Sequence, residues 1–417
     1  MTSQRKSAER LRALRRRPEI VALARAARRR GIAAWIVGGA LRDAVLGIAS
    51  PEIDVAVSHD AGGLAADLER GGLGRAVFLS RDRPGPRVYR VAGRRPLDLA
   101  ELEAGSLDAD LARRDFTANA VALDVSSGAV VDPFGGLRDA ARRRLSCVRP
   151  GNLAEDPLRI LRAARFLATH GLVPDAGVLA ASRAAAGLFA AAAPERVGNE
   201  LARLLGSPRA GPSLAWAARA RILGTALGRD MTAARAAALA RSLAALDAPA
   251  VSRRSPTRRR RMRLALLALC LGHDAAGARA WLHGRRWARE EAREAAALCG
   301  LALASRRLPS RGLHARRSAF AWILEAEEDG LFDDATALLS RLGPSDRRRA
   351  ATLRRLARRP RPRLRVSGGD VVRWLGLAPG PRVGELLSAV RVAAAMGEAR
   401  TRREARNWLT GQVPERP

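Results

Sequence analysis

Residues 36–43 read IVGGALRD, and residues 52–54 read EID shortly after. The first stretch joins an apolar, strand-like run to a helix-like segment through Gly38 and Gly39. A strand that ends in glycines lets backbone amides approach a phosphate closely, and the helix that follows offers its positive end. Arg42 then adds a charge-assisted hydrogen bond to the same phosphate. This stretch therefore predicts a phosphate-binding turn at the end of a strand.

Two carboxylates stand on the strand that is expected after this turn. Residues two apart in a strand point to the same face, so Glu52 and Asp54 lie about 7 Å apart along the backbone on one face. A carboxylate pair of this kind is able to hold a divalent metal for phosphoryl or nucleotidyl transfer. A double-glycine turn with an acidic pair also occurs without such chemistry, so other motifs have to support the assignment.

The strand signals are confined to the N-terminal part of the chain. Six stretches have the apolar content or the alternation that is typical of strands: 33–37, 53–57, 88–91, 97–100, 120–125 and 129–131. Helices are expected over 18–30 and 41–46. Beyond about residue 152 the chain becomes a succession of helices rich in Ala, Leu and Arg. The predicted fold class is therefore an α+β head followed by an all-α remainder.

The charge of the chain points to a polyanionic partner. Its 417 residues allow about two to four domains. The 75 Lys and Arg residues exceed the 41 Asp and Glu residues, so the formal net charge is +34, and Lys6 is the sole lysine. An excess of this size predicts salt-sensitive binding to nucleic acid. Arginine runs at 253–254, 258–261 and 354–363 together favour a polyanion-binding helical body, although any single run is typical of a solvated helix face.

The apolar and cysteine patterns favour a cytoplasmic protein. No run of about 18 apolar residues is free of charge, so no membrane partner is expected. Residues 1–17 lack the apolar core of a signal peptide. Cys147, Cys270 and Cys299 are odd in number and unclustered, which argues against a disulfide framework and against a thiolate zinc site.

Further motifs follow in a fixed order along the chain: RRDFTANA at 113–120, DPFGGL at 132–137, EDPLRILRAARF at 155–166, PERV at 194–197, SGGD at 367–370 and LGLAPGPRVGE at 375–385. In order and spacing, these motifs and the IVGGALRD stretch resemble the class II tRNA nucleotidyltransferase and bacterial poly(A) polymerase family, within the polymerase-β-like nucleotidyltransferase superfamily. The resemblance covers nearly the whole chain, and the last motif is similar to the tail of the tRNA-adding members.

The resemblance implies a polymerase-β-like nucleotidyltransferase head with a small mixed sheet, followed by an all-α neck, body and tail. We expect the catalytic head at 1–150, the neck that reads the base at 151–212, the body at 213–362 and the tail at 363–417. Body and tail are expected to bind tRNA. The implied substrates are ATP and CTP, the implied metal is Mg²⁺, and the implied reaction adds CMP, AMP or both to the tRNA 3′ end.

The catalytic carboxylates that the resemblance implies are Glu52, Asp54 and Asp98, with Glu52 and Asp54 as the metal pair. The family has Asp-x-Asp where this chain has Glu52 first. The additional methylene moves the carboxylate by roughly 1.5 Å, whereas Mg²⁺ tolerates little departure from octahedral geometry. After Asp98 the family usually has an arginine, and this chain has Glu101 and Glu103 instead.

Ten positions match the nucleotide-binding motifs of the family: Gly38, Gly39, Arg42, Arg114, Asp115, Asn119, Asp156, Arg159, Arg162 and Arg165. The two glycines and the first arginine match the phosphate-binding turn. The resemblance implies that Arg114, Asp115 and Asn119 engage the ribose and the phosphates. Arg162 and Arg165 are expected near the triphosphate.

Asp156 and Arg159 match the pair that recognises the edge of the base. On a helix, residues i and i+3 are neighbours, so an acceptor at Asp156 and a donor at Arg159 form one polar strip that matches a Watson–Crick edge. A small rotation of this strip accepts either cytosine or adenine. The alternative interpretation is an i,i+3 ion pair at a helix end, which is a common arrangement.

Other functions stay open at this point. The chain could add only CC or only the final A, or it could be a poly(A) polymerase, which shares the head. A third alternative is an RNA-binding homologue whose catalytic head is weakened, as Glu52 allows. The LGLAPGP stretch at 375–381 favours the tRNA enzyme over the poly(A) polymerase.

Overall fold

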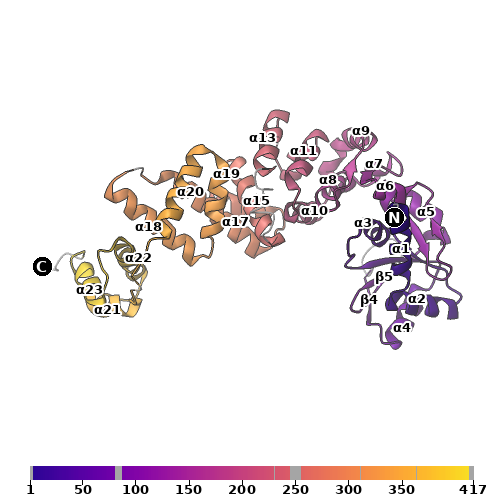
Figure 1. The fold of residues 1–417 in the computed structure, drawn as a ribbon, viewed down its shortest axis with the longest axis horizontal. Coiled ribbons are helices and arrows are strands. Elements are labelled where there is room, and N and C mark those ends of the chain that lie inside the picture. The colour runs from indigo at the N-terminus through magenta and orange to yellow at the C-terminus, as the bar shows by residue number, and fades with distance from the viewer. Residues whose placement is uncertain are drawn as a thin grey trace. The chain divides into compact units, whose positions relative to one another are not determined.

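The computed structural model describes residues 3–79, 87–229, 231–244, 255–309, 311–362 and 364–412. The chain divides into two compact units, one formed by Met1–Leu204 with Pro208–Ala237 and the other by Leu205–Ser207 with Ala238–Pro417. Figure 1 shows the ribbon of both units and labels many of their helices, together with β4 and β5. The finer division into head, neck, body and tail stays a prediction.

A mixed sheet forms the centre of the first unit. Among the described residues it has seven strands, which lie in the order β3 (Arg75–Phe78), β4 (Val88–Ala92), β5 (Leu97–Glu101), β2 (Ile53–Val57), β1 (Ala34–Val37), β6 (Ala122–Asp124) and β7 (Val130–Val131). Strand β1 is antiparallel to β2 and β6, whereas β2 is parallel to β5. These pairings confirm the small mixed sheet.

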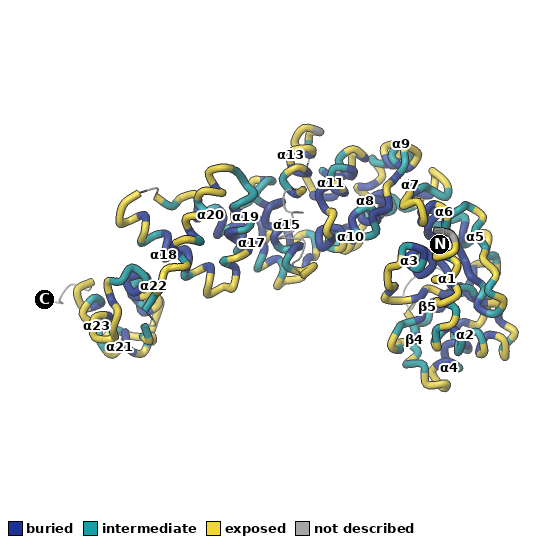
Figure 2. The backbone as a smooth tube through the Cα atoms, viewed as in Figure 1, coloured by how far each residue is buried: buried dark blue, intermediate teal, exposed yellow. Residues whose placement is uncertain are grey.

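Buried and exposed side chains alternate at the start of β2. Ile53 and Val55 are fully buried, whereas Asp54 between them is exposed. The register places Asp54 directly beside Val37 of β1 and Asp98 of β5. Figure 2 distinguishes the buried stretches in dark blue from the exposed ones in yellow. Because the side chains of β2 alternate, Ile53 and Val55 face the apolar core while Asp54 between them faces the surface.

Helices and short elements complete the first unit. Those that begin in it are α1 (Ser3–Arg15), α2 (Pro18–Arg29), α3 (Gly39–Leu46), α4 (Ala61–Arg70), α5 (Leu107–Ala112), α6 (Gly136–Ala141), α7 (Asn152–Glu155), α8 (Leu158–His170), α9 (Ala176–Ala185), α10 (Pro194–Gly206), α11 (Ala210–Arg219), α12 (Leu223–Leu227) and α13 (Ala233–Ala244). Three 3₁₀ segments are η1 (Glu103–Gly105), η2 (Thr117–Asn119) and η3 (Ala186–Ala191). Strands β8 (Arg144–Leu145) and β9 (Val173–Pro174) form a separate parallel pair.

The six predicted strands are confirmed as β1, β2, β4, β5, β6 and β7, with ends that differ by one or two residues. Strand β3 has no counterpart among the predictions, because its side chains alternate between exposed and half-buried at the edge of the sheet and form no apolar run. Helix α1 is also unpredicted, since its sequence is dominated by polar residues. Strand β9 lies beyond residue 152, where only helices are expected.

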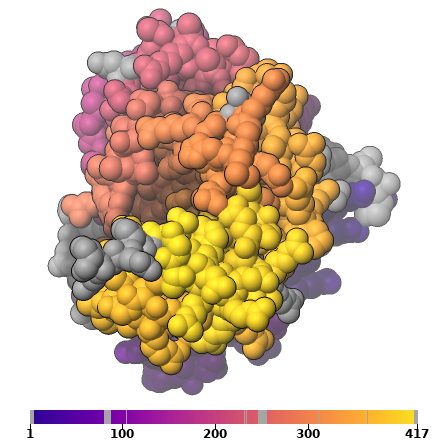
Figure 3. All heavy atoms as spheres, turned by 90° about the vertical axis from the view of Figure 1, so that its left-hand side faces the viewer, coloured from indigo at the N-terminus to yellow at the C-terminus, as the bar shows by residue number. Residues whose placement is uncertain are grey.

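The second unit is helical in the part that the structure describes, which confirms the all-α remainder. Its helices are α15 (Pro256–Cys270), α16 (Ala275–Gly284), α17 (Arg289–Arg307), α18 (Gly312–Glu328), α19 (Phe332–Leu342), α20 (Pro344–Ala357), α21 (Gly368–Leu375), α22 (Pro381–Met396) and α23 (Arg402–Thr410). The last three share a core around Val371, Val390 and Leu409. The C-terminal residues form the yellow surface in Figure 3. None of the described helices has the length and apolar character needed to cross a bilayer.

The arginine run at 258–261 lies on α15 and has partners within the second unit. Two of its guanidiniums pair with Asp334, whose side chain is fully buried. A third pairs with Glu291, and the fourth donates to a backbone carbonyl. This run therefore compensates internal carboxylates. The run at 253–254 lies outside the described residues, and a polyanion-binding role for 354–363 stays a prediction.

Candidate active site

The predicted phosphate-binding turn connects β1 to α3 through Gly38. Gly38 has a φ of 71°, in the left-handed region that favours glycine. A Cβ at this position would lie 2.6 Å from Nη1 of Arg114. The backbone N–H of Gly38 donates to the carbonyl of Val121 over 3.1 Å, so this amide is engaged within the protein, and Gly39 begins α3. The turn thus needs glycine for its backbone shape and for the approach of Arg114.

Arg42 is buried and links α3 to α8. Its Nη1 donates to Oδ1 of Asn119 over 2.6 Å, and its Nε donates to Oδ1 of Asp43 over 2.9 Å. Nη2 lies 3.2 Å from Nε2 of His170, and the guanidinium stands 4.8 Å from the centre of the Phe166 ring. In this structure Arg42 therefore makes its contacts within the protein and connects α3 to α8. Its role as a phosphate clamp stays a prediction.

Two titratable groups beside Arg42 have shifted pKa values. Burial alone would raise the pKa of Asp43, but the hydrogen bond with His170 and the charge of Arg42 hold it below its ordinary value. Burial lowers the pKa of His170, and Asp43 opposes this only in part. At neutral pH the cluster therefore contains a neutral imidazole and a balanced pair of charges.

Asn119, Asp115 and Arg162 continue this network into α8. Asn119 donates from Nδ2 to Oδ1 of Asp115 over 2.8 Å, and Arg162 donates from Nε to Oδ2 of Asp115 over 2.8 Å. Burial alone would raise the pKa of Asp115, but the charge of Arg162, the Asn119 amide and the backbone N–H of Phe116 lower it. The structure thus brings together residues from two separate motifs and keeps Asp115 ionised in the interior.

Glu52, Asp54 and Asp98 lie at the neighbouring ends of β2 and β5, where Asp54 and Asp98 are directly paired positions. Among the described residues, no hydrogen bond reaches the exposed carboxylate of Asp54. Although this side chain is exposed, the surrounding atoms remove part of its hydration and raise its pKa. Asp98 and Glu52 raise the pKa further, and Arg114 opposes them. Asp54 thus carries a charge that the protein compensates only in part.

Arg90 of β4 joins this group and has no counterpart among the predicted site residues. It stands directly opposite Asp98 in the antiparallel pair β4–β5. Its Nε and Nη2 each donate over 2.7 Å to one oxygen of Asp98, and Nη2 also donates over 2.8 Å to Oε2 of Glu52. The hydrogen bonds to Asp98, and then the charges of both carboxylates, raise the pKa of Arg90. A cation opposite an acidic residue on a neighbouring strand is the signal that could identify it.

The donor set at this edge of the sheet is suited to Mg²⁺. In proteins Mg²⁺ takes one or two carboxylates and completes its shell with water and substrate phosphates. Glu52 and Asp54 supply such a pair, and the pKa of Asp54 is raised first by lost hydration and then by the charges of Asp98 and Glu52, which a bound cation would offset. In the described ranges no group of three or more acidic, His or Cys side chains is arranged to hold an ion. A metal here would therefore depend on the substrate for its other ligands.

Arg114 borders the Gly38 turn and remains partly exposed. Its Nε and Nη2 donate to Oδ2 of Asp110 over 3.0 and 2.7 Å, and its Nη1 donates to the carbonyl of Asn119 over 3.1 Å. Asp110 is a further residue that the motifs do not indicate. The arrangement holds a guanidinium between the turn and the carboxylates, where its charge lowers the pKa of Asp54.

The predicted base-recognition pair does not lie on one helix. Asp156 follows α7 with a φ of −134° and a ψ of 93°, and α8 begins only at Leu158. Pro157 stands between them, and a residue that precedes proline is disfavoured in the helical conformation. The prediction of an i,i+3 strip on a helix is therefore wrong. Its alternative, an ion pair between Asp156 and Arg159, does not occur among the ion pairs of the described residues either.

Asp156 and Arg159 instead have separate partners. Oδ2 of Asp156 accepts a hydrogen bond from Arg196 of α10 over 2.8 Å. Arg159 donates from Nη1 to the carbonyl of Asn152 over 2.9 Å. Oδ1 of Asp156 accepts from the backbone N–H of Leu158 over 3.2 Å, so each of its oxygens already accepts one hydrogen bond. Both side chains are half-buried, and lone pairs of Asp156 and N–H groups of Arg159 remain for further contacts. Arg196 belongs to the PERV motif, to which the sequence assigns no role.

Arg165 is buried against α10. Its Nε donates to Oε2 of Glu200 over 2.5 Å, and its guanidinium stands 4.0 Å from the centre of the Phe166 ring. Burial lowers the pKa of Arg165 to about 10, against the attraction of Glu200. The ion pair is its role in this structure, and a place near a triphosphate stays a prediction.

Proteins of known activity are similar to this chain over most of its length. A family model described as the poly A polymerase head domain matches residues 86–146. The CC-adding tRNA nucleotidyltransferase of Geobacter sulfurreducens is 35% identical over 410 residues, which cover 93% of this chain and 94% of that protein. The A-adding tRNA nucleotidyltransferase of Deinococcus radiodurans is 32% identical over 428 residues, which cover 92% and 96%.

A solved structure has the same fold. The Bacillus stearothermophilus CCA-adding enzyme in complex with CTP superposes with a TM-score of 0.67 at 25% identity, and the match covers 95% of this chain and 98% of that one. The likeness therefore extends beyond the sheet-containing unit into the helical one.

Proposed function

This chain belongs to the class II tRNA nucleotidyltransferase and poly(A) polymerase family, and from that premise we propose that it adds CMP, AMP or both to the 3′ end of tRNA. The observation that carries the proposal is Asp54, an exposed carboxylate with a raised pKa that lies beside Glu52 and near the Gly38 turn. Perturbed carboxylates of this kind are concentrated at functional sites. Full-length relatives that add CC or A to tRNA support the same conclusion.

The proposed reaction is a displacement at phosphorus. The 3′ hydroxyl of the tRNA attacks the α-phosphate of CTP or ATP, a new P–O bond forms, and pyrophosphate leaves with the electrons of the bond that breaks. Glu52 and Asp54 would hold Mg²⁺, which when bound offsets phosphate charge and lowers the pKa of the hydroxyl. In this proposal Arg114 holds a phosphate group. The buried network between Arg42 and Asp115 keeps the turn and α8 at a fixed spacing.

Base selection belongs to Asp156 and Arg159 in this proposal. Asp156 accepts from the amino group that cytosine and adenine share, and Arg159 donates to the neighbouring ring nitrogen. Asp156 is oriented by Arg196 and by the backbone N–H of Leu158, and Arg159 is oriented by the carbonyl of Asn152. Each carboxylate oxygen keeps a second lone pair, and Arg159 keeps further N–H groups. Uracil and guanine present the opposite pattern at these positions, so they leave both side chains unpaired.

The same proposal includes a role for the body and the tail, and a cytoplasmic location. The body at 213–362 and the tail at 363–417 would bind tRNA, and the net charge of +34 supports this assignment. A reducing cytoplasm fits the cysteines, because burial raises the pKa of both Cys147 and Cys299 to about 12 and leaves their thiols unreactive.

The test is an incorporation assay. A tRNA without its CCA end is incubated with the protein, Mg²⁺ and either CTP, ATP or both, and the products are separated on a sequencing gel. Addition of up to three nucleotides supports the proposal. Absence of addition to this tRNA and to one that ends in CC, with Mg²⁺ and with Mn²⁺ and with tRNA binding retained, would instead identify an RNA-binding homologue.

Product length separates the related activities. Two added nucleotides with CTP alone, and no further addition with ATP, indicate a CC-adding enzyme, as in the Geobacter relative. One added nucleotide on a tRNA that ends in CC, with no addition to a tRNA without CCA, indicates an A-adding enzyme, as in the Deinococcus relative. A long tail from ATP alone indicates a poly(A) polymerase.

A further inference from the structure

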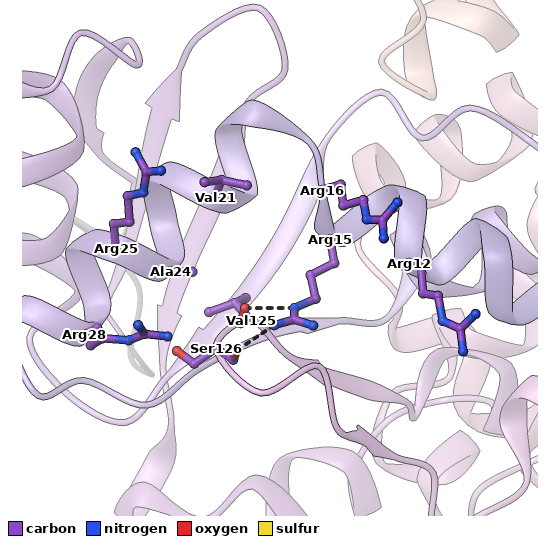
Figure 4. A pocket seen from close by; sticks show the side chains of 9 residues that line it. All are labelled: Arg12, Arg15, Arg16, Val21, Ala24, Arg25, Arg28, Val125 and Ser126. Carbon is purple, nitrogen blue, oxygen red and sulfur yellow. Dashed lines mark hydrogen bonds between the residues drawn. The ribbon is translucent and has the colours of Figure 1, made fainter.

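A cleft lined by arginines lies in the first unit, between α1, α2 and the turn that follows β6 (Figure 4). Its volume is about 560 Å³. Five arginines line it, and none of the lining residues is acidic: Arg12, Arg15, Arg16, Arg25 and Arg28. The remaining lining residues are small or apolar, apart from one serine. The cleft thus offers many hydrogen-bond donors and positive charges with no carboxylate to compensate them.

Arg15 fixes one wall of the cleft. It donates from Nη2 to the carbonyl of Ser126 over 2.7 Å and from Nε to the carbonyl of Val125 over 3.4 Å, as the dashed lines in Figure 4 show. The turn is shaped around this side chain, because Gly128 has a φ of 80° and a Cβ there would lie 2.5 Å from Nη1 of Arg15. The hydrogen bonds of Arg15 therefore connect α1 to the turn after β6 and fix the shape of the cleft.

The other four arginines of the cleft have no ion pair or side-chain hydrogen bond in the part of the chain that the structure describes. Other arginines of the chain differ from these four. Arg30, one residue beyond α2, is paired with Asp60 and Asp67, and the run at 258–261 is fully engaged within its own unit. Four unpaired arginines that gather around one cleft without an acidic lining residue form a local positive surface that fits an external anion.

We propose that this cleft binds the phosphate backbone of RNA, as a site on the head that is separate from the catalytic carboxylates. Guanidinium groups match phosphate oxygens in a planar, two-pronged geometry. On one side of the cleft stand Arg12 and Arg16, and on the other stand Arg25 and Arg28. Within each pair the two residues are about one helical turn apart, roughly 5.4 Å. This spacing suits a row of phosphates better than one small anion. No large exposed apolar side chain among the described residues lines the cleft, which disfavours a membrane surface. That the RNA is tRNA rests on the proposed function.

The cleft and the catalytic group lie at opposite ends of β1. The N–H of Val125 donates to the carbonyl of Ala34 at the start of this strand, whereas the Gly38 turn follows its end. Three steps of a strand separate the two ends by about 10 Å. An RNA that contacts the cleft is therefore held by a different surface from the one that would hold the nucleotide.

The experiment replaces Arg25→Gln and Arg28→Gln together and measures the affinity for a tRNA without CCA, in the absence of nucleotide and metal. Between about 50 and 200 mM salt, loss of two phosphate contacts is expected to weaken binding roughly tenfold and to reduce the slope of log K against log salt by about 1.4–1.8. Arg12→Gln with Arg16→Gln should give a similar reduction. The matched control is Arg29→Gln with Arg142→Gln, two exposed arginines outside the cleft, for which the slope is expected to stay near that of the wild type.

The outcomes separate the possible occupants. Equal losses in the cleft pair and in the control pair would mean that only overall charge matters, which overturns the site. Unchanged tRNA binding with weaker binding of pyrophosphate or CTP would make the cleft a small-anion site. Displacement of tRNA by polyglutamate from the wild type alone would make it an acidic-peptide site. Because binding is measured without catalysis, a failed incorporation assay overturns the proposed function and leaves this result intact.

Discussion

The buried network around Asp115 and the open group around Asp54 both combine carboxylates with arginine, and they differ in how their central carboxylate is compensated. In the network each carboxylate accepts from a guanidinium or an amide, and the pKa of Asp115 is lowered. In the open group Asp54 has no hydrogen-bond partner among the described residues, and its pKa is raised. The difference teaches that the head uses arginine to fix its framework and leaves one carboxylate available to an external cation.

The largest expected effect comes from removing the open carboxylate. Asp54→Ala should abolish nucleotide incorporation, because the metal pair loses one member, while tRNA affinity remains nearly unchanged. The melting temperature should not fall, since the substitution removes a charge whose pKa the fold raises. Incorporation, tRNA binding and thermal unfolding are measured on one preparation. Retained turnover would refute the metal assignment.

Breaking the closed network should instead cost stability. Asp115→Asn leaves Arg162 without its buried partner and should lower the free energy of unfolding by about 3 kcal/mol at neutral pH. Because the folded pKa of Asp115 lies below the ordinary 3.8, its stabilisation is fully present above that value and is lost as pH falls through the lowered one. Urea unfolding at neutral pH and near pH 3 should therefore show a difference that shrinks in acid. Asp108→Asn, an exposed carboxylate nearby, serves as control and should change little.

Arg90 tests this comparison further, because its guanidinium donates to Asp98 and Glu52 within the open group. Arg90→Gln should slow incorporation by about tenfold through misplacement of Glu52, and Arg90→Lys should recover part of the rate because a cation remains. In a Glu52→Asp background the shorter side chain no longer reaches Arg90, so Arg90→Gln should have a smaller effect. Initial rates over a range of Mg²⁺ concentrations measure this coupling. Strictly additive effects would contradict it.

The smallest expected effect concerns the exposed pair between Asp156 and Arg196. Arg196→Gln removes one hydrogen bond that orients the carboxylate. Surface pairs contribute up to about 1 kcal/mol, so discrimination between CTP and UTP should fall by up to about fivefold. Competition between the two nucleotides in single-addition assays provides the measurement. A larger loss would show that Arg196 itself contacts the base.

The sequence predicts correctly those features that depend on residues close together in the chain. The strands β1, β2 and β5 follow from apolar alternation, and the glycine at position 38 follows from the turn it has to make. The partners Arg90, His170 and Glu200 come from other elements, so they depend on strand register and on helix packing that no local pattern contains.

The error at Asp156 has a different origin. The helical period is read straight through Pro157, although a proline at this position is a signal that a helix begins there. Arginine content misleads in a related way, since the run at 258–261 looks like a solvated or RNA-binding face. Its carboxylate partners lie far away in the sequence.

The proline before α8 has a consequence for the position of the carboxylate that is proposed to contact the base. Positions three apart on a helix keep a separation of about 5–6 Å. Asp156 precedes Pro157 and Arg159 follows it. The carbonyl of Asp156 accepts from the N–H of Arg159 over 2.9 Å, and its Oδ1 accepts from the N–H of Leu158 over 3.2 Å, so the first turn of α8 fixes the spacing between acceptor and donor. In the proposed function, the carboxylate that contacts the base would therefore belong to a residue outside the helical conformation, held in place by the backbone N–H groups with which α8 begins.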